Sequence, residues 1–264
     1  MTNLNILIIE GNDPKNNEFF KKAAKASCSE NLKKLVLKLK PNSNIEIINP
    51  ANDIQTKTAL ENIKSYHGLI FTGGAMRLND MTNEIKKHIS FASNCFKYEN
   101  KILAICWGLQ VCSVAAGGKV SSGKNGAHVG IASDIEINEE GKKNPIYKNK
   151  KIKFTSPAFN YDEVCEMPQD ATLLSSDKVN KVMGLYFKSG KSKIWGLQYH
   201  PDYEYWQMIN LSSARKDRII ENNHFKNEDD FQKHLNYIKE EDQKLDFENR
   251  TCEIKNWLEI INTN

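Results

Sequence analysis

Residues 101–118 read Lys-Ile-Leu-Ala-Ile-Cys-Trp-Gly-Leu-Gln-Val-Cys-Ser-Val-Ala-Ala-Gly-Gly, and the rest of the chain is organised around them. Ile102 to Ile105 form a short apolar run, which is typical of a fully buried strand. Cys106 follows at once, and the small-residue segment after it has helical character up to the stop signal Gly117-Gly118. The sequence therefore predicts a strand, a tight turn and a helix, with a cysteine at the turn.

Cys106 has two interpretations. In a nucleophile elbow, a strand-to-helix turn exposes a reactive side chain at the carboxyl edge of a sheet, and small residues are needed two places before and after it. Ala104 and Gly108 occupy those two places, and a helix N-terminus just after Cys106 would favour the thiolate form. The alternative is a buried structural cysteine, because free cysteine is among the most buried residue types.

A second strand end favours the catalytic interpretation. Residues 194–204, Ile-Trp-Gly-Leu-Gln-Tyr-His-Pro-Asp-Tyr-Glu, run from an apolar strand into a polar cluster with His200, Asp202 and Glu204. A cysteine nucleophile needs a base, and the base needs an acceptor that fixes its tautomer. Cys106, His200 and one of the two carboxylates can supply these roles.

A third strand end carries two glycines. The segment Gly68-Leu-Ile-Phe-Thr-Gly-Gly-Ala75 reads as a buried strand that runs into Gly73 and Gly74. A glycine loop of this kind can turn a backbone N–H toward a developing oxyanion. Three strand ends thus carry the parts of one acyl-transfer site.

Together these motifs resemble the three signatures of class I glutamine amidotransferases, in the family's order and at its spacing. They are Thr72-Gly73-Gly74, Ala104-Ile-Cys-Trp-Gly-Leu-Gln110 and Gly196-Leu-Gln-Tyr-His-Pro-Asp202. The resemblance runs from about Ile6 to Asp202. The remainder is most similar to the stand-alone, GMP synthase-like branch, whose members often carry a C-terminal helical extension. Arg250-Thr-Cys-Glu-Ile-Lys-Asn-Trp-Leu258 resembles the closing motif of that branch.

The resemblance implies a reaction through a thioester. The Cys106 thiolate would attack the γ-carboxamide carbon, and His200 would protonate the leaving ammonia and then activate water to release glutamate. Asp202 would orient His200. The family usually has Glu two places after the histidine, at the position that Asp202 occupies in this chain. Because the Asp side chain is shorter by one methylene group, Glu204 remains the alternative as the orienting carboxylate.

The resemblance also implies the surroundings of the nucleophile. The backbone N–H groups of Gly74 and Trp107 would hold the oxyanion, a contribution of about 3–4 kcal/mol per donor in comparable sites. Gly73 and Gln110 would bind the substrate. The family normally carries a histidine where this chain has Asn160, in a loop that we expect to line the site entrance. No cofactor and no metal ion are expected.

The pattern of strands and helices predicts an α/β fold of the flavodoxin-like, doubly wound type with a mixed sheet. Apolar strands alternate with helices up to Gly118, after which the strands lack intervening long helices and a more antiparallel arrangement is expected. We expect an amidotransferase-like domain over residues 1–204. Residues 205–264 are predicted to form a helical extension packed on it, with Trp257 and Leu258 as anchors because an aromatic near a terminus needs burial to be ordered.

Composition narrows the functional class. The 264 residues carry a net charge of +4, and almost all of the positively charged side chains are lysines. A nucleic-acid surface usually clusters arginine with aromatic residues, so no nucleic-acid partner is expected. No apolar stretch reaches the length of a membrane span. Six irregularly spaced cysteines without a CxxC pair fit a reducing cytoplasm.

Several histidines and cysteines receive structural interpretations. Cys112 is expected to face the core, and His88, like the histidines at 67, 224 and 234, is expected to be solvated. His128 is interpreted as a surface histidine, with a polar residue near the site as the alternative.

Three functions stay open. The first is a glutamine amidotransferase subunit, with a separate synthetase as ammonia acceptor, or a stand-alone glutaminase. The second is a hydrolase of another γ-glutamyl amide or peptide on the same scaffold. The third is a catalytically silent binding or regulatory homologue, against which the intact Cys106 and His200 argue. The small-molecule substrate and the choice between monomer and homodimer are not decided by the sequence.

Overall fold

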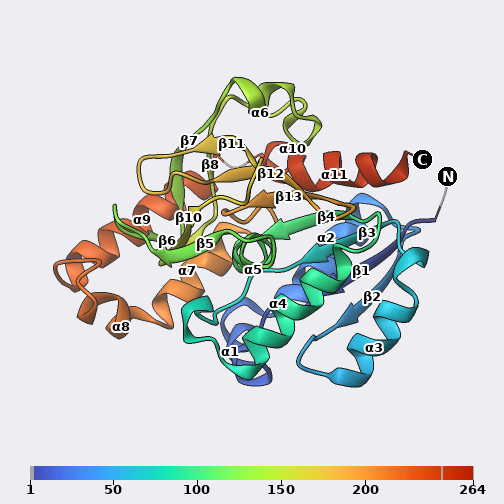
Figure 1. The fold of residues 1–264 in the computed structure, drawn as a ribbon. Helices are drawn as coiled ribbons and strands as arrows, with labels where there is room; N and C mark the ends of the chain where they lie inside the picture. The colour runs from blue at the N-terminus through green and yellow to red at the C-terminus, as the bar shows by residue number, and fades with distance from the viewer. Residues whose placement is uncertain (1–2, 245, 264) are drawn as a thin grey trace.

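The computed structural model describes residues 3–244 and 246–263 and shows a central mixed sheet between two layers of helices (Figure 1). The sheet has nine strands in the order β2-β1-β3-β4-β13-β12-β11-β7-β8. Its parallel half comprises β2 (Asn44–Ile48), β1 (Asn5–Ile9), β3 (Gly68–Phe71), β4 (Lys101–Ile105) and β13 (Ser192–Leu197). Its antiparallel half comprises β12 (Gly184–Ser189), β11 (Thr172–Ser176), β7 (Ala132–Ile137) and β8 (Lys153–Ser156). The α/β, flavodoxin-like fold class is confirmed.

Helices cover both faces of the parallel half. On one face lie α2 (Cys28–Leu39) and α11 (Cys252–Asn262), whose apolar residues share a core with β1, β4 and β13. On the other face lie α3 (Asp53–Glu61), α4 (Asn83–Cys95) and α5 (Trp107–Ala115). The carboxyl ends of the parallel strands are therefore the open edge at which a ligand site can form.

Local sequence signals explain where the helices begin. The Asp13 side chain accepts from the Asn16 amide and Pro14 is the first residue of α1 (Pro14–Ala24). Ser27 and Glu30 form a reciprocal capping box for α2, and Thr82 caps α4. The cap of α3 is Asn52, whose side chain accepts from the amides of Ile54 and Gln55.

The three prolines at positions 145, 157 and 168 predict a loop-rich segment over residues 138–168, but this segment contains more regular structure than they suggest. It holds α6 (Glu139–Lys143), the turn η3 (Pro145–Tyr147) and three strands, which are β8, β9 (Phe159–Asn160) and β10 (Asp162–Glu166). β10 pairs with β5 (Lys119–Ser122), and β9 pairs with β6 (His128–Val129). These two small ribbons lie outside the main sheet, and short strands of this kind have too little alternation to be recognised in the sequence.

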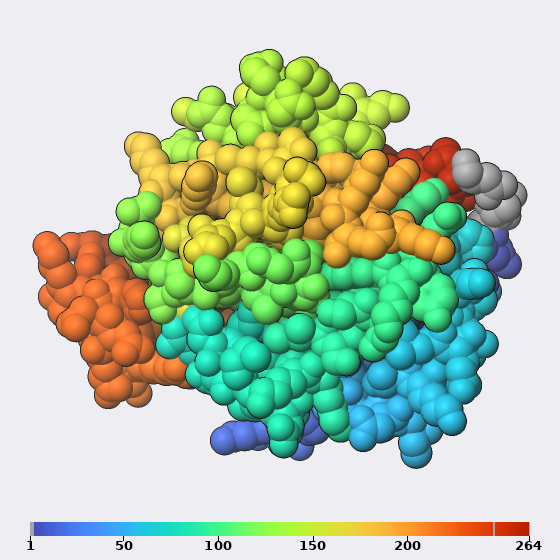
Figure 2. Space-filling view, viewed as in Figure 1, coloured from blue at the N-terminus to red at the C-terminus, as the bar shows by residue number. Residues whose placement is uncertain are grey.

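The chain after His200 divides into two parts. The first, α7 (Tyr205–Ser213), α8 (Lys216–Glu221) and α9 (Glu228–Asp242), forms a lobe at the side of the molecule, orange in Figure 2. The second, α10 (Phe247–Arg250) and α11, runs back across the sheet. The apolar spacing predicts one helix over residues 208–220, but this segment is interrupted between α7 and α8. It predicts the next helix over residues 231–245, and the end of that helix at Leu245 lies outside the described residues.

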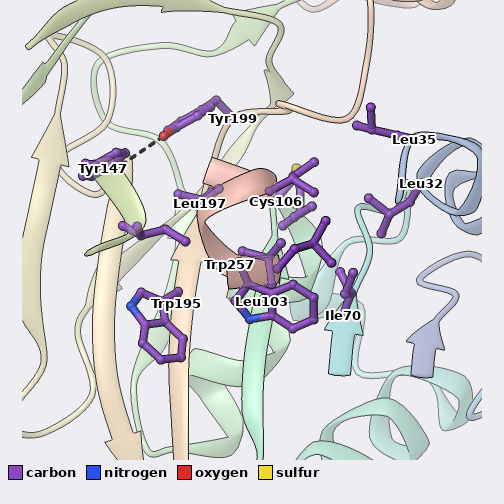
Figure 3. Packing of buried hydrophobic residues seen from close by; sticks show 14 of the residues in the cluster. Leu32, Leu35, Ile70, Leu103, Cys106, Tyr147, Trp195, Leu197, Tyr199 and Trp257 are labelled. Atoms are coloured by element: carbon purple, nitrogen blue, oxygen red, sulfur yellow. Dashed lines mark hydrogen bonds between the residues drawn. The ribbon is translucent and has the colours of Figure 1, made fainter. Parts of the chain in front are cut away.

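Trp257 holds α11 against the sheet. Its side chain is fully buried in one cluster with Leu103 and Ile70 (Figure 3). A Cβ added to Gly68 would lie 2.6 Å from the Trp257 ring, so the first residue of β3 must lack a side chain for the helix to sit this close.

Candidate active site

Cys106 sits at a strained turn between β4 and α5. Its φ of 50° and ψ of −108° are unusual for a residue with a side chain, and such strain persists only where the surroundings impose it. Its amide donates to the Leu197 carbonyl at the end of β13, at 2.6 Å. A Cβ at Gly108 would collide with the Phe71 carbonyl oxygen, which explains the glycine two places after the cysteine. The turn therefore has the geometry of a nucleophile elbow.

The structure brings His200 and Asp202 together. The His200 Nδ1 atom lies 3.1 Å from Asp202 Oδ1, and both side chains are buried. Glu204 points elsewhere, because its Oε2 accepts from Trp206 Nε1 at 2.7 Å while Oε1 lies 3.5 Å from Arg250. Of the two candidate carboxylates, Asp202 is the one placed to fix the histidine.

The electrostatics of His200 favour its protonated form. Burial disfavours the charge, but the neighbouring Cys106 and Asp202 outweigh burial and raise the pKa of His200 to about 10. The second Asp202 oxygen, Oδ2, is buried and makes no hydrogen bond within the described residues. In general, a cation beside a thiol favours the nucleophilic thiolate form.

Gln198 is a site residue that the sequence analysis did not single out, although it lies inside the third motif. Its side chain is fully buried, and Nε2 lies 3.4 Å from Cys106 Sγ. The Sγ atom also lies 3.8 Å from the Phe159 carbonyl oxygen. Gln198 therefore places an amide donor at the sulfur of Cys106.

The glycine loop packs directly against the histidine. A Cβ at Gly73 would lie 2.6 Å from His200 Cε1, so only glycine leaves room for the imidazole. Asn12, another residue missed from sequence, accepts from the Ala75 amide at 2.7 Å and so fixes the loop. Gly74 and Trp107, the two predicted oxyanion donors, line the same cavity as Cys106. Gly73 is placed by its contact with His200 and is absent from the cavity lining.

Gln110 projects from α5 into the site. Its Nε2 atom donates to the Asp162 carbonyl at 2.8 Å and to Gln198 Oε1 at 3.3 Å. Its donors are therefore engaged by protein, and the side-chain oxygen is the atom left for a ligand. An acceptor at this position suits an ammonium group of a substrate.

Asn160 lines the cavity, as expected for its loop, and is held by His128. The two His128 ring nitrogens lie 2.9 Å from Asn160 Oδ1 and 2.8 Å from Asp177 Oδ2. The surface interpretation of His128 was wrong, because the residue is buried at the β6–β9 ribbon.

His88 is also buried, so the expectation of a solvated side chain was wrong. It lies on the inner face of α4, and its ring meets the Trp107 ring edge to face at 4.8 Å. Burial lowers its pKa to about 4, so it packs as a neutral ring. Cys112 faces the core, as predicted.

A cavity of about 330 Å³ opens in front of Cys106. Besides the three motifs, its wall includes side chains from α1, from β9 and β10, and from α7 and α8. In residues 3–244 and 246–263, no cluster of three or more histidine, cysteine or acidic side chains could hold a metal ion. The same part of the chain has no helix long and apolar enough to cross a membrane.

Comparison with known proteins agrees with this geometry. The family model for glutamine amidotransferase class-I matches residues 23–208. The chain belongs to the class I glutamine amidotransferase family. A γ-glutamyl-L-1-hydroxyisopropylamide hydrolase from a Pseudomonas species is 26% identical over 99% of this chain and 94% of its own length.

Two further members of the family show how widely it varies. The glutamine-hydrolyzing GMP synthase subunit of Methanococcus vannielii is 28% identical over 58% of this chain and 75% of its own length. The crystal structure of a glutamine amidotransferase from Thermotoga maritima covers 100% of both chains with a TM-score of 0.70 at 17% identity. The fold is thus shared over the full length, including the segment after His200.

Proposed function

We propose that this protein hydrolyses a γ-glutamyl amide, with Cys106 as nucleophile, His200 as general acid and base, and Asp202 as the group that orients His200. The observation that carries the proposal is the strained turn at Cys106, which stands in one cavity with His200. The similarity of nearly the whole chain to a γ-glutamyl amide hydrolase also supports the proposal.

The proposed reaction has two stages. The Cys106 thiolate adds to the γ-carbonyl carbon, the C–N bond breaks, and the His200 proton goes to the leaving ammonia or amine. Water then gives a proton to neutral His200 and attacks the thioester, which releases glutamate and restores the thiolate. The amides of Gly74 and Trp107 would hold the oxyanion in both stages.

Release of amine or ammonia from a panel of γ-glutamyl compounds, glutamine included, tests this function. Cys106→Ser should lose essentially all turnover, whereas Cys112→Ser, at a core position on the same helix, should retain it. Full turnover by Cys106→Ser would contradict the proposal.

A second candidate is an amidotransferase subunit that passes ammonia to a separate synthetase. The similarity to the glutamine-hydrolyzing subunit of a GMP synthase favours it. Glutamine turnover that rises on adding a synthetase partner would support this candidate, whereas efficient hydrolysis of substituted γ-glutamyl amides by the isolated chain would favour the hydrolase.

A further inference from the structure

The proposed role of His200 as a proton donor determines which end of the substrate lies next to its imidazole ring. This residue gives its proton to the leaving amine, so the amine side of the substrate must lie next to the imidazole. The His200 ring meets the Tyr203 ring at 5.1 Å, perpendicular to it. Tyr203 belongs to an apolar cluster with Phe20, Met208 and Leu211, all of which also line the cavity. The leaving group therefore faces an apolar wall.

Arg215 lies at this apolar wall, between α7 and α8. Its guanidinium carbon is 4.4 Å from the centroid of the Phe19 ring, 5.2 Å from that of Phe159 and 5.3 Å from that of Phe20. Contact with three aromatic faces holds the planar guanidinium in place by cation–π attraction. A fork of N–H donors is thus fixed before any ligand arrives, which lowers the entropy cost of binding.

No carboxylate of the described chain pairs with Arg215. Asp162 is the one carboxylate in the described cavity wall, and Arg77 already binds it at 2.6 Å. The wall also carries Lys15 and Arg218 without an ion-pair partner in the described residues. The cavity therefore has an excess of positive charge that suits an anionic ligand.

The burial of Arg215 gives its unpaired charge an energetic consequence. Burial lowers the pKa of its guanidinium, although an arginine stays protonated in proteins. A half-buried cation without a counter-ion is unfavourable, and a carboxylate held by the guanidinium fork would offset that cost.

We propose that Arg215 binds a carboxylate on the leaving group, so that the preferred substrates are γ-glutamyl amino acids or short γ-glutamyl peptides with an apolar or aromatic residue next to the scissile amide. The apolar residue would pack on Phe20, Met208 and Leu211, and its carboxylate would reach Arg215. This inference rests on the proposed hydrolase function and names its substrate class.

The test compares two probes that differ only in the carboxylate, γ-glutamylphenylalanine and γ-glutamylphenethylamide. The wild-type protein should show a kcat/KM about 10- to 100-fold higher for the acid, the usual range for a hydrogen-bonded ion pair. Arg215→Gln should remove this preference through KM and leave the phenethylamide within about threefold. Arg215→Lys, which keeps the charge and loses the fork, should give an intermediate value.

Lys216→Gln is the matched control. It removes the same charge from the adjacent residue, which pairs with Glu228 and is outside the cavity wall, and both probes should be unaffected. Equal melting temperatures for the Arg215 variants and the wild type would show that folding is intact.

Each other outcome overturns the inference in a recognisable way. Equal losses on both probes would place Arg215 at the glutamyl carboxylate that the probes share. No loss on either probe would remove Arg215 from the site. Turnover of glutamine without turnover of either probe would refute the substrate class and leave glutaminase activity standing, whereas no turnover of any γ-glutamyl compound would refute the hydrolase function itself.

Discussion

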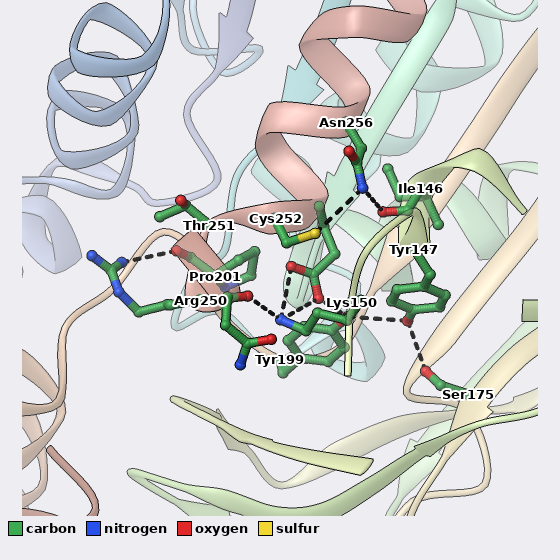
Figure 4. Close-up of polar contacts among 12 residues, drawn as sticks. Ile146, Tyr147, Lys150, Ser175, Tyr199, Pro201, Arg250, Thr251, Cys252 and Asn256 are labelled. Atoms are coloured by element: carbon green, nitrogen blue, oxygen red, sulfur yellow. Dashed lines mark hydrogen bonds and ion pairs between the residues drawn. The ribbon is translucent and has the colours of Figure 1, made fainter. Parts of the chain in front are cut away.

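Two arginines that follow His200 in the sequence differ in whether the protein itself supplies hydrogen-bond acceptors for the guanidinium group. Arg250, at the end of α10, donates from Nη1 to the carbonyl oxygens of Pro201 and Tyr203 at 2.9 and 3.0 Å, and its contact with Pro201 is drawn in Figure 4. Arg215, in the lobe formed by α7–α9, has aromatic neighbours and no acceptor within the described residues. The Arg250 guanidinium is engaged through Nη1 by the protein's own carbonyl groups, whereas the Arg215 guanidinium is left for a ligand.

The segment that contains Arg250 fixes the backbone on both sides of His200. Beyond Arg250, the Glu253 carboxylate is fully buried, pairs with Lys150 at 2.9 Å and accepts from the Tyr199 hydroxyl at 2.6 Å. Tyr199 precedes His200, and Pro201 follows it. We therefore assign α10 and α11 to positioning His200, and we assign the lobe to contacting the substrate.

The largest effect is expected at Asp202. Asp202→Asn should lower kcat by about 10³- to 10⁴-fold, the size seen when a triad histidine loses its orienting carboxylate. Since the Asp202 carboxylate helps to raise the pKa of His200, its loss lowers that pKa, and the alkaline limb of the pH–rate profile should move to lower pH.

Glu204→Gln is the control for Asp202→Asn. Glu204 caps α7 and contacts Arg250, so the variant should retain most turnover and the wild-type pH profile. The reverse ranking of the two variants would assign the orienting role to Glu204.

The next effect concerns stability. Trp257→Ala should lower the free energy of unfolding by about 3–5 kcal/mol, because it leaves a cavity under β3 and β4. Trp206→Ala, in the partly exposed first turn of α7, should cost under about 1 kcal/mol. Denaturant melts compare the two, and equal losses would contradict the division of the segment into an anchoring part and a substrate-facing part.

A smaller effect on kcat is expected at Arg250, and it should show whether this residue positions His200 or binds the substrate. Arg250→Gln should lower kcat by about 10- to 100-fold, because the backbone around His200 loses charge-assisted hydrogen bonds, while KM stays close to wild type. Lys255→Gln, which breaks an exposed pair with Glu248, should change neither constant. A rise in KM with unchanged kcat would place Arg250 in binding.

The sequence predicted the parallel half of the fold well, because buried apolar runs and helix caps are local signals. The elbow at Cys106 and the strand end at His200 also follow from short segments. The β5–β10 and β6–β9 ribbons were missed, since their pairing joins residues that are 30 to 47 positions apart in the sequence.

The cavity wall was less predictable for the same reason. Gln198 stood inside a recognised motif without a role, and only the fold shows that its amide faces Cys106. Arg215 lies in a charged stretch of sequence, which predicts an exposed side chain. In the structure it is surrounded by the rings of Phe19 and Phe20 from α1 and of Phe159 from β9. His88 and His128 were misjudged because a polar residue's burial depends on which helix face or ribbon it occupies.

The most direct test of the account is to map the cysteine that a glutamine-analogue diazo-ketone modifies. Cys28 also lines the cavity, but burial raises the pKa of its thiol well above the ordinary value. Cys106 shares the cavity with His200, whose pKa is raised by the neighbouring Cys106 and Asp202 although burial opposes the shift. Peptide mass spectrometry should therefore find one adduct per chain, at Cys106, and inactivation in step with it. An adduct at Cys28, or inactivation that leaves the Cys106 thiol free, would contradict the account.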